Sequence, residues 1–162
     1  MLTAVLERRI GLPLGQQDVY VNVVGGARIL EPAADLAVML AIISAYQERP
    51  VPSNMVAFGE VGLTGEIRPV GQPEARAREA LNMGFTQLLL PRHNHARVQE
   101  AKLAATLAPD SKVKVQCKAV RNMAEAAQAL LTRIYSTIYY WLLPASPWCS
   151  HCGVVSCGRL SP

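Results

Sequence analysis

The sequence predicts a layered α/β domain, in which helices pack on a sheet. Segments of strand character alternate with segments of helical period from residue 1 to about residue 131, and this order is typical of βαβ architecture. Hydrophobic residues make up 51% of the chain and charged residues 17%, which is enough apolar material for a core. Because the period is lost beyond residue 133, we expect a domain over residues 1–133 and an irregular tail over 134–162.

In the first part of the chain we expect two helices with a strand between them. Residues 1–10 have an amphipathic helical pattern that Gly11 ends. Residues 18–24 alternate apolar and polar side chains, a pattern that predicts a strand. Pro32 is suited to the first turn of a helix over residues 33–46. This helix is apolar on nearly all sides, so we expect it at the centre of the core.

The rest of the domain is predicted to repeat strand and helix. The spacing predicts strands over residues 55–61, 86–90 and 112–119 and helices over 73–83, 93–108 and 122–131. Gly62 and Gly65 separate the first of these strands from a short extended stretch over residues 66–70, which indicates a hairpin.

The charge and the apolar segments narrow the classes of protein that the chain can represent. A net charge of +4 is compatible with an anionic partner but does not require one. The start of the chain lacks a secretory signal pattern. The longest uncharged apolar segments, residues 36–46 and 134–145, fall short of the ~20 residues that a membrane span needs. We therefore expect a cytoplasmic protein with no membrane partner.

Two motifs resemble one known family. They are GGARILEPAADLA at residues 25–37 and FGEVGLTGEIRPV at residues 58–70. Together they resemble the carboxy-terminal domain of the bacterial RadA (Sms) family of DNA-repair proteins, a domain that is similar in fold to the proteolytic domain of Lon. The resemblance implies a Lon-protease-like fold over residues 1–133. It also implies that the first strands of that domain are missing, so that this chain begins inside it.

The same resemblance implies that the peptidase dyad of Lon is lost. Active relatives have a serine nucleophile after Gly-Pro, and the matching residue here is Ala33. The residue matching the lysine base is Arg76, whose guanidinium stays protonated at neutral pH and cannot accept the serine proton. Asp35 replaces a glycine and adds negative charge where an oxyanion would form. We therefore expect no enzyme activity of this chain; the alternative is a degenerate Lon-type serine peptidase with residual or recruited activity.

The resemblance further implies a non-catalytic scaffold for oligomerisation and DNA binding. In that family the domain serves an ATP-dependent repair and recombination protein that drives branch migration. Implied partners are single-stranded or branched DNA, other copies in a hexameric ring, and a RecA-type recombinase. The chain has no GxxxxGK[ST] phosphate loop. We therefore expect no cofactor here, with ATP, Mg and Zn bound by other parts of the parent protein.

A basic stripe is the candidate DNA contact. Lys112, Lys114 and Lys118 fall on one face of the predicted strand over residues 112–119, and Arg121 follows it. Such a stripe could follow a DNA backbone without reading its sequence. The alternative is an edge strand on which lysines prevent aggregation. Arg76 and Arg78 have two similar interpretations, a solvated helix face or a contact with a subunit or a phosphate.

The tail contains three of the four cysteines, Cys149, Cys152 and Cys157, with His151 between the first two. A WCxxC sequence is compatible with thiol redox chemistry, but such sites need the start of a helix. Zinc is a weak alternative because His151 lies inside the CxxC span and is a poor fourth ligand. A third interpretation is an extension without a function of its own. Cys117 stands apart from these and is expected to be a small buried hydrophobe.

Overall fold

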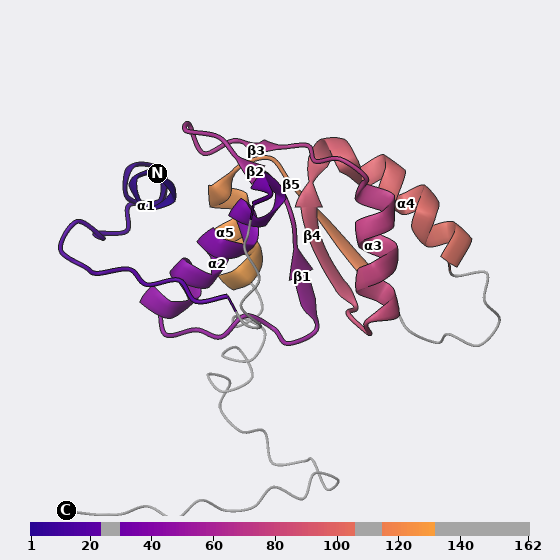
Figure 1. The fold of residues 1–162 in the computed structure, drawn as a ribbon, viewed down its shortest axis with the longest axis horizontal. Helices are drawn as coiled ribbons and strands as arrows, with labels where there is room; N and C mark the ends of the chain where they lie inside the picture. The colour runs from indigo at the N-terminus through magenta and orange to yellow at the C-terminus, as the bar shows by residue number, and fades with distance from the viewer. Residues whose placement is uncertain (24–29, 106–114, 132–162) are drawn as a thin grey trace, which may run out of the picture. The chain divides into compact units, whose positions relative to one another are not determined.

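A computed structural model describes residues 1–23, 30–105 and 115–131. Figure 1 shows helices on both sides of a sheet, as the sequence predicts. The structure assigns α1 to Leu2–Val5, η1 to Leu6–Ile10, η3 to Pro32–Ala34, α2 to Asp35–Tyr46, β1 to Met55–Ala57, β2 to Glu60–Val61, β3 to Ile67–Arg68, α3 to Pro73–Asn82, β4 to Gln87–Pro91, α4 to Arg92–Ala105, β5 to Gln116–Val120 and α5 to Met123–Leu131. The residues predicted to form the tail, 134–162, lie outside the described ranges.

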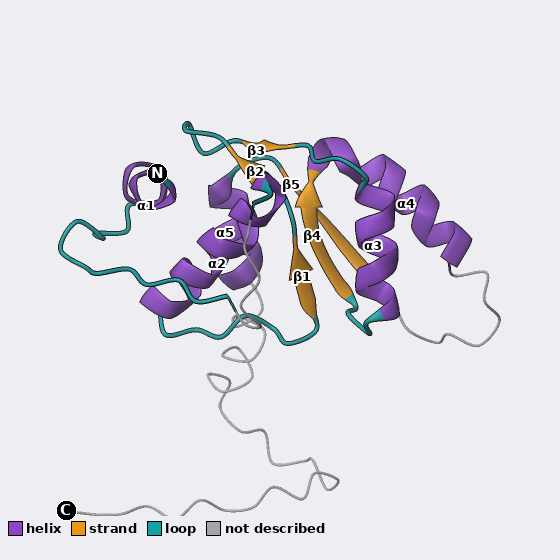
Figure 2. Cartoon of the chain, viewed as in Figure 1, coloured by secondary structure: helices purple, strands orange, loops and turns teal. Residues whose placement is uncertain are grey.

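The main sheet has the order β1-β4-β5, with both pairs parallel. The α3 helix connects β1 to β4 and α4 connects β4 to β5. Parallel neighbours need such crossovers, and the fixed hand of the crossover places successive helices on the same face. In Figure 2, α3 and α4 cover one face of the sheet and α2 and α5 the other. The predicted α/β layering is therefore confirmed.

Each face of the sheet has its own apolar cluster. The larger cluster is centred on α2, where Leu36, Met39 and Ile43 are fully buried, and it includes residues of α5 and of the N-terminal helix. The smaller cluster joins α3 and α4 to the sheet through Phe58, Leu90 and other apolar residues. Cys117 packs at the border of this smaller cluster and is half-buried rather than fully buried.

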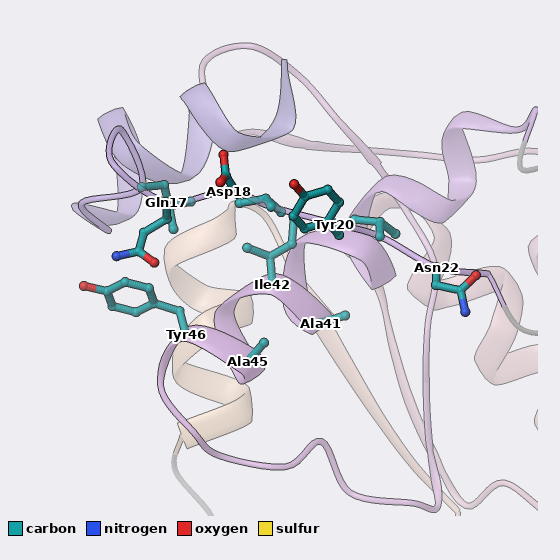
Figure 3. A pocket seen from close by; sticks show the side chains of 11 residues that line it. Gln17, Asp18, Tyr20, Asn22, Ala41, Ile42, Ala45 and Tyr46 are labelled. Atoms are coloured by element: carbon teal, nitrogen blue, oxygen red, sulfur yellow. The ribbon is translucent and has the colours of Figure 1, made fainter.

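The segment predicted to be a strand at residues 18–24 is not one over its described part, residues 18–23. A strand requires a hydrogen-bonded neighbour, and this segment pairs with none of the described strands. Instead it runs along α2, and the two together line a groove of about 430 Å³ (Figure 3). Tyr20 is 90% exposed beside Val19 and Val21. The alternation of residue types was therefore misleading here.

The strand predicted over residues 55–61 is divided into β1 and β2. The Phe58 amide still donates to the Leu89 carbonyl of β4 at 3.1 Å, but the Gly59 amide donates to the Ala33 carbonyl instead. A Cβ atom on Gly59 would lie 3.0 Å from Ile67, 3.2 Å from Leu36 and 3.3 Å from Pro91, so these side chains would have to shift to accommodate one. Beyond it, β2 pairs antiparallel with β3, which confirms the predicted hairpin. The helix predicted at residues 1–10 is also present, although its second half has π-helical hydrogen bonding.

Candidate functional site

Ala33 lies in the 3-10 turn that begins the central helix. Pro32 fixes the backbone at the first position of this turn, while Glu31 before it is extended. The backbone of Gly59 holds the turn in place: its amide donates to the Ala33 carbonyl at 2.8 Å, and its carbonyl accepts from the Leu36 amide at 3.0 Å. Ala33 is buried. A methyl group therefore occupies the position that the resemblance assigns to a nucleophile.

Arg76 projects from α3 toward the residue that precedes this turn. Its guanidinium forms a two-pronged ion pair with the Glu31 carboxylate: Nη2 donates to Oε1, and Nη1 donates to Oε2 at 3.1 Å. Its Nε donates to the Gly71 carbonyl at 2.9 Å. The two positions that the resemblance matches to the dyad, Ala33 and Arg76, are thus brought to the same end of the domain.

Arg76 lies on a partly exposed side of α3, and neither of its two interpretations included a contact within the chain. Its side chain is 28% exposed and engaged by Glu31 and Gly71, because α3 presents this side toward the start of α2. Arg78, two residues further on, is exposed as predicted. Glu31 was not identified from the sequence as a partner of Arg76. The pair could have been predicted from charge. Glu31 is acidic and lies close to the residue matched to the nucleophile, and Arg76 is basic and is itself matched to the base.

A groove of about 660 Å³ lies between the start of α2 and the β2–β3 hairpin. Four carboxylates line it, together with one arginine and several apolar residues. The charged residues are Glu31, Asp35, Glu60, Glu66 and Arg68, and the exposed apolar ones are Met1, Leu30 and Leu63. Since three of the four carboxylates contact an arginine, Asp35 is the one without an arginine partner in the described part of the chain. Its Oδ2 instead accepts from the Val61 amide at 3.4 Å.

Hydrogen bonds organise the charges on the hairpin. The Thr64 hydroxyl and amide both donate to Oε2 of Glu66, and Arg68 donates to Oε1 at 2.7 and 3.0 Å. These bonds lower the pKa of Glu66 from 4.5 to about 2, and the bond from the Thr64 hydroxyl has the largest effect. Arg68 also contacts Glu60 at 3.3 Å, and both glutamates raise the pKa of its guanidinium. Glu66 is therefore a fixed negative charge at any neutral pH.

The side chains that line this groove offer little for acyl-transfer chemistry. Among the described lining residues, Thr64 has the only hydroxyl, and that hydroxyl already donates to a carboxylate. No lysine, histidine or cysteine is among them, so none of them is a neutral base of the kind that activates a serine or threonine. The excess of carboxylates also opposes the build-up of negative charge in a transition state.

The basic stripe is described in part. Lys112 and Lys114 lie outside the described residues, while Lys118 on β5 and Arg121 just beyond it are both exposed. Lys118 and Gln116 are on one face of β5, as predicted. Within the described sheet, β5 pairs only with β4 and forms an edge. Both interpretations of the stripe, DNA contact and edge protection, are therefore compatible with its position.

The Arg121 backbone is held by two other segments. Its carbonyl accepts from the Ile67 amide at 2.7 Å, and its amide donates to Glu125 Oε2 at 2.9 Å. The Asn122 side chain caps α5 by accepting from the Glu125 amide at 2.9 Å. These bonds fix the backbone from which the Arg121 side chain projects into solvent.

The tail residues Cys149, His151, Cys152 and Cys157 lie outside the described ranges, so the redox and zinc interpretations stay as they were. In residues 1–23, 30–105 and 115–131, no three His, Cys, Asp or Glu side chains are grouped to hold a metal ion. None of the described helices is long and apolar enough to cross a membrane.

Comparison with known proteins agrees with the fold and the motifs. Residues 12–133 match the family described as the Lon protease (S16) C-terminal proteolytic domain. Since this match covers most of the sequence, the chain belongs to that family. The chain therefore contains a Lon-type domain. The resemblance noted in the sequence is confirmed by relatives that share one name.

These relatives are DNA repair proteins named RadA. The chain is 52% identical to the protein of Haemophilus influenzae over 91 residues, which cover 56% of this chain and 20% of the relative. It is 50% identical to that of Escherichia coli K12 over 94 residues, which cover 58% of this chain and 20% of the relative. It is 47% identical to that of Pseudomonas aeruginosa over 103 residues, which cover 64% of this chain and 23% of the relative. The chain thus spans about a fifth of the length of the curated relatives that it matches.

Proposed function

We propose that this chain is a non-catalytic scaffold domain of a RadA-type DNA repair protein. The observation on which the proposal rests is the geometry at the start of α2. Ala33, which the resemblance matches to the nucleophile, is buried, and Arg76, which it matches to the base, is engaged in an ion pair with Glu31. An arginine fixed by a carboxylate is neither free nor neutral. A Lon-type fold without either half of the dyad favours a role in assembly and binding.

DNA is the partner that best fits both the relatives and the exposed charges. The relatives are named DNA repair proteins. Lys118 and Arg121 are exposed, and no carboxylate of the described residues forms an ion pair with either. The carboxylates of the groove repel phosphate, so we place the DNA at β5 and not in the groove. Because such contacts are to the backbone, single-stranded and branched DNA would bind without sequence preference.

Self-assembly is the second part of the proposal. Val19, Tyr20, Val21 and Tyr46 are exposed around the groove beside α2, and apolar side chains grouped in this way are typical of surfaces that contact another protein. We propose that the parent protein uses this domain in a hexameric ring that drives branch migration alongside a RecA-type recombinase. That assembly follows from the family resemblance, and the exposed apolar group is compatible with it.

The alternative function is a degenerate peptidase with a recruited nucleophile. Its candidate is Ser44, which lies near the far end of α2 and donates its hydroxyl hydrogen to the Arg49 carbonyl. Ala33 lies before the other end of this helix, and no base is among the described hydrogen-bond partners of Ser44. The scaffold function is therefore favoured.

Two assays test the proposal. Turnover of a casein or fluorogenic peptide substrate should be absent for the wild type, and the variant Ser44→Ala should be indistinguishable from it. Anisotropy with a labelled single-stranded oligonucleotide should show binding at low salt that weakens steeply as salt rises. The charge reversal Lys118→Glu with Arg121→Glu should weaken binding more than the matched reversal of two exposed arginines elsewhere, Arg78→Glu with Arg92→Glu. Peptide turnover that Ser44→Ala abolishes would refute the scaffold proposal.

A further inference from the structure

A second arginine lies beside the proposed DNA contact, although it is far from it in the sequence. Arg9 belongs to the π-helical turn Leu6–Ile10, in which Leu6 is fully buried while Arg8 and Arg9 are exposed. Gly11 ends the turn in the left-handed conformation. The buried leucine anchors the turn to the core, so the arginines on its outer side have a fixed backbone.

Gly65 at the tip of the β2–β3 hairpin holds the stem of Arg9. A Cβ atom on Gly65 would lie 3.1 Å from Cγ and 3.3 Å from Cβ of Arg9, so the arginine stem packs directly on the hairpin backbone. Gly65 has a φ of +84°, which also favours glycine at this position. The stem is therefore restrained before any ligand binds, which lowers the entropy lost on binding.

The same hairpin joins Arg9 to the stripe. The Gly65 carbonyl accepts from the Met123 amide at 2.9 Å, and the Ile67 amide donates to the Arg121 carbonyl at 2.7 Å. In Figure 1 the hairpin reaches from the start of α5 toward the N-terminal helix. Residues 65–67 thus contact both Arg9 and the backbone of Arg121, two arginines on segments more than a hundred residues apart in the chain.

Some arginines of the domain form ion pairs with glutamates, and others have a guanidinium group that is free to bind an anion. Arg68 contacts Glu60 and Glu66, Arg76 contacts Glu31, and Arg97 contacts Glu74 at 2.5 Å. Among the described residues, neither Arg9 nor Arg121 has a carboxylate within ion-pair distance. Glu125 accepts from the Arg121 amide, not from its guanidinium. Two guanidinium groups beside the hairpin are therefore available for an anion from outside the domain.

We propose that Arg9 extends the Lys118–Arg121 stripe into one phosphate-binding surface for the DNA backbone. The inference rests on the proposed DNA-binding function and adds a contact that the stripe does not include. Guanidinium groups match the geometry of phosphate oxygens and bind them through two N–H donors. Hairpin residues 65–67 act as the spacer that holds Arg9 and Arg121 at the same end of the domain. The carboxylate of Glu66 within this spacer is already paired with Arg68 at 2.7 Å, so it opposes a phosphate at Arg9 less than an unpaired carboxylate would.

The test measures the affinity of the full chain for a labelled single-stranded oligonucleotide as a function of salt. Arg9→Gln should weaken binding several-fold at low salt and reduce the slope of log affinity against log salt by about one phosphate contact. Arg9→Lys should retain much of the slope because the charge is kept. The matched control Arg78→Gln removes an exposed arginine from α3, away from the hairpin, and should change neither quantity.

Three outcomes are distinguishable. If Arg9→Gln weakens binding and lowers the slope while Arg78→Gln does not, the inference is supported. If the wild type binds and Arg121→Gln weakens it but Arg9→Gln has no effect, the inference is overturned and the proposed function stands. If the wild type does not bind DNA at low salt, both are overturned. Circular dichroism of each variant would establish that the fold is retained.

Discussion

Arg76 and Glu31, separated by 45 residues in the sequence, form an ion pair of two parallel contacts at the end of the domain where α2 begins. The pair connects α3 to the residue before the turn that contains Ala33. It takes up the side chain that the family resemblance matches to a catalytic lysine. The position that the resemblance matches to the lysine base is here part of a contact between α3 and the extended residue before the turn.

Breaking this pair should lower stability modestly. We expect Arg76→Ala to reduce the free energy of unfolding by about 1 kcal/mol, since Glu31 is 57% exposed and solvent screens the pair. Urea denaturation would measure the change. Arg78→Ala, which removes an exposed arginine from the same helix, is the control and should be nearly neutral. If both variants lose the same free energy of unfolding, the ion pair does not contribute to stability.

Gly65 should tolerate alanine poorly for two separable reasons. Its φ of +84° is left-handed and the stem of Arg9 lies 3.1 Å from the new Cβ. We expect Gly65→Ala to cost about 1–2 kcal/mol. Gly84→Ala meets the same kind of backbone strain because Gly84 has a φ of +88°, but its new Cβ would have no atom within 4 Å. It should therefore cost less stability than Gly65→Ala. Gly71→Ala, in open space and without a left-handed φ, should be close to neutral in thermal denaturation.

Asn94 should be one of the most sensitive polar positions. It is 3% exposed, and its side-chain amide accepts from the Val70 amide at 2.9 Å and donates to the Val70 carbonyl at 3.1 Å. Asn94→Ala leaves the part-buried N–H and C=O groups of Val70 without this partner, so we expect a loss of about 1–3 kcal/mol in denaturant unfolding. Gln99→Ala on the same helix, at a half-buried position, is the comparison and should cost clearly less.

Acid should weaken the domain in a defined range through Glu66. Its folded pKa of about 2 lies below the ordinary 4.5, so the unfolded chain takes up a proton first. This contribution to stability is complete above about pH 4.5 and is lost as the pH falls toward 2. Glu66→Gln should flatten the dependence of the melting temperature on pH in that range and leave it unchanged above pH 6. A dependence identical to that of the wild type would contradict the assignment.

The order of elements could be predicted from the sequence because it depends on local patterns. Helix period, proline at the start of α2 and the glycines of the hairpin are all visible in the chain. The failure at residues 18–23 has a physical cause, since alternation only shows that a segment suits a pleated surface. Whether it becomes a strand depends on a neighbouring backbone with free hydrogen-bonding groups.

The candidate site could be predicted only in part. Ala33 and Arg76 are candidates because motifs place them. Lys118 is a candidate because charge alternates along a strand, and Arg121 because it follows that strand. The partner of Arg76 and the proximity of Arg9 to the stripe depend on which helices and hairpin meet in space. Contacts between Glu31 and Arg76, or between Gly65 and Arg9, leave no periodic trace in the sequence because long-range packing determines them.

The most direct test of the scaffold proposal is the mass of the chain in solution, measured by size-exclusion chromatography with light scattering at low salt, with and without single-stranded DNA. We predict a mass above that of one 17.6 kDa chain and a further shift to higher mass when DNA is added. A strict monomer whose elution does not change with DNA would contradict the proposal.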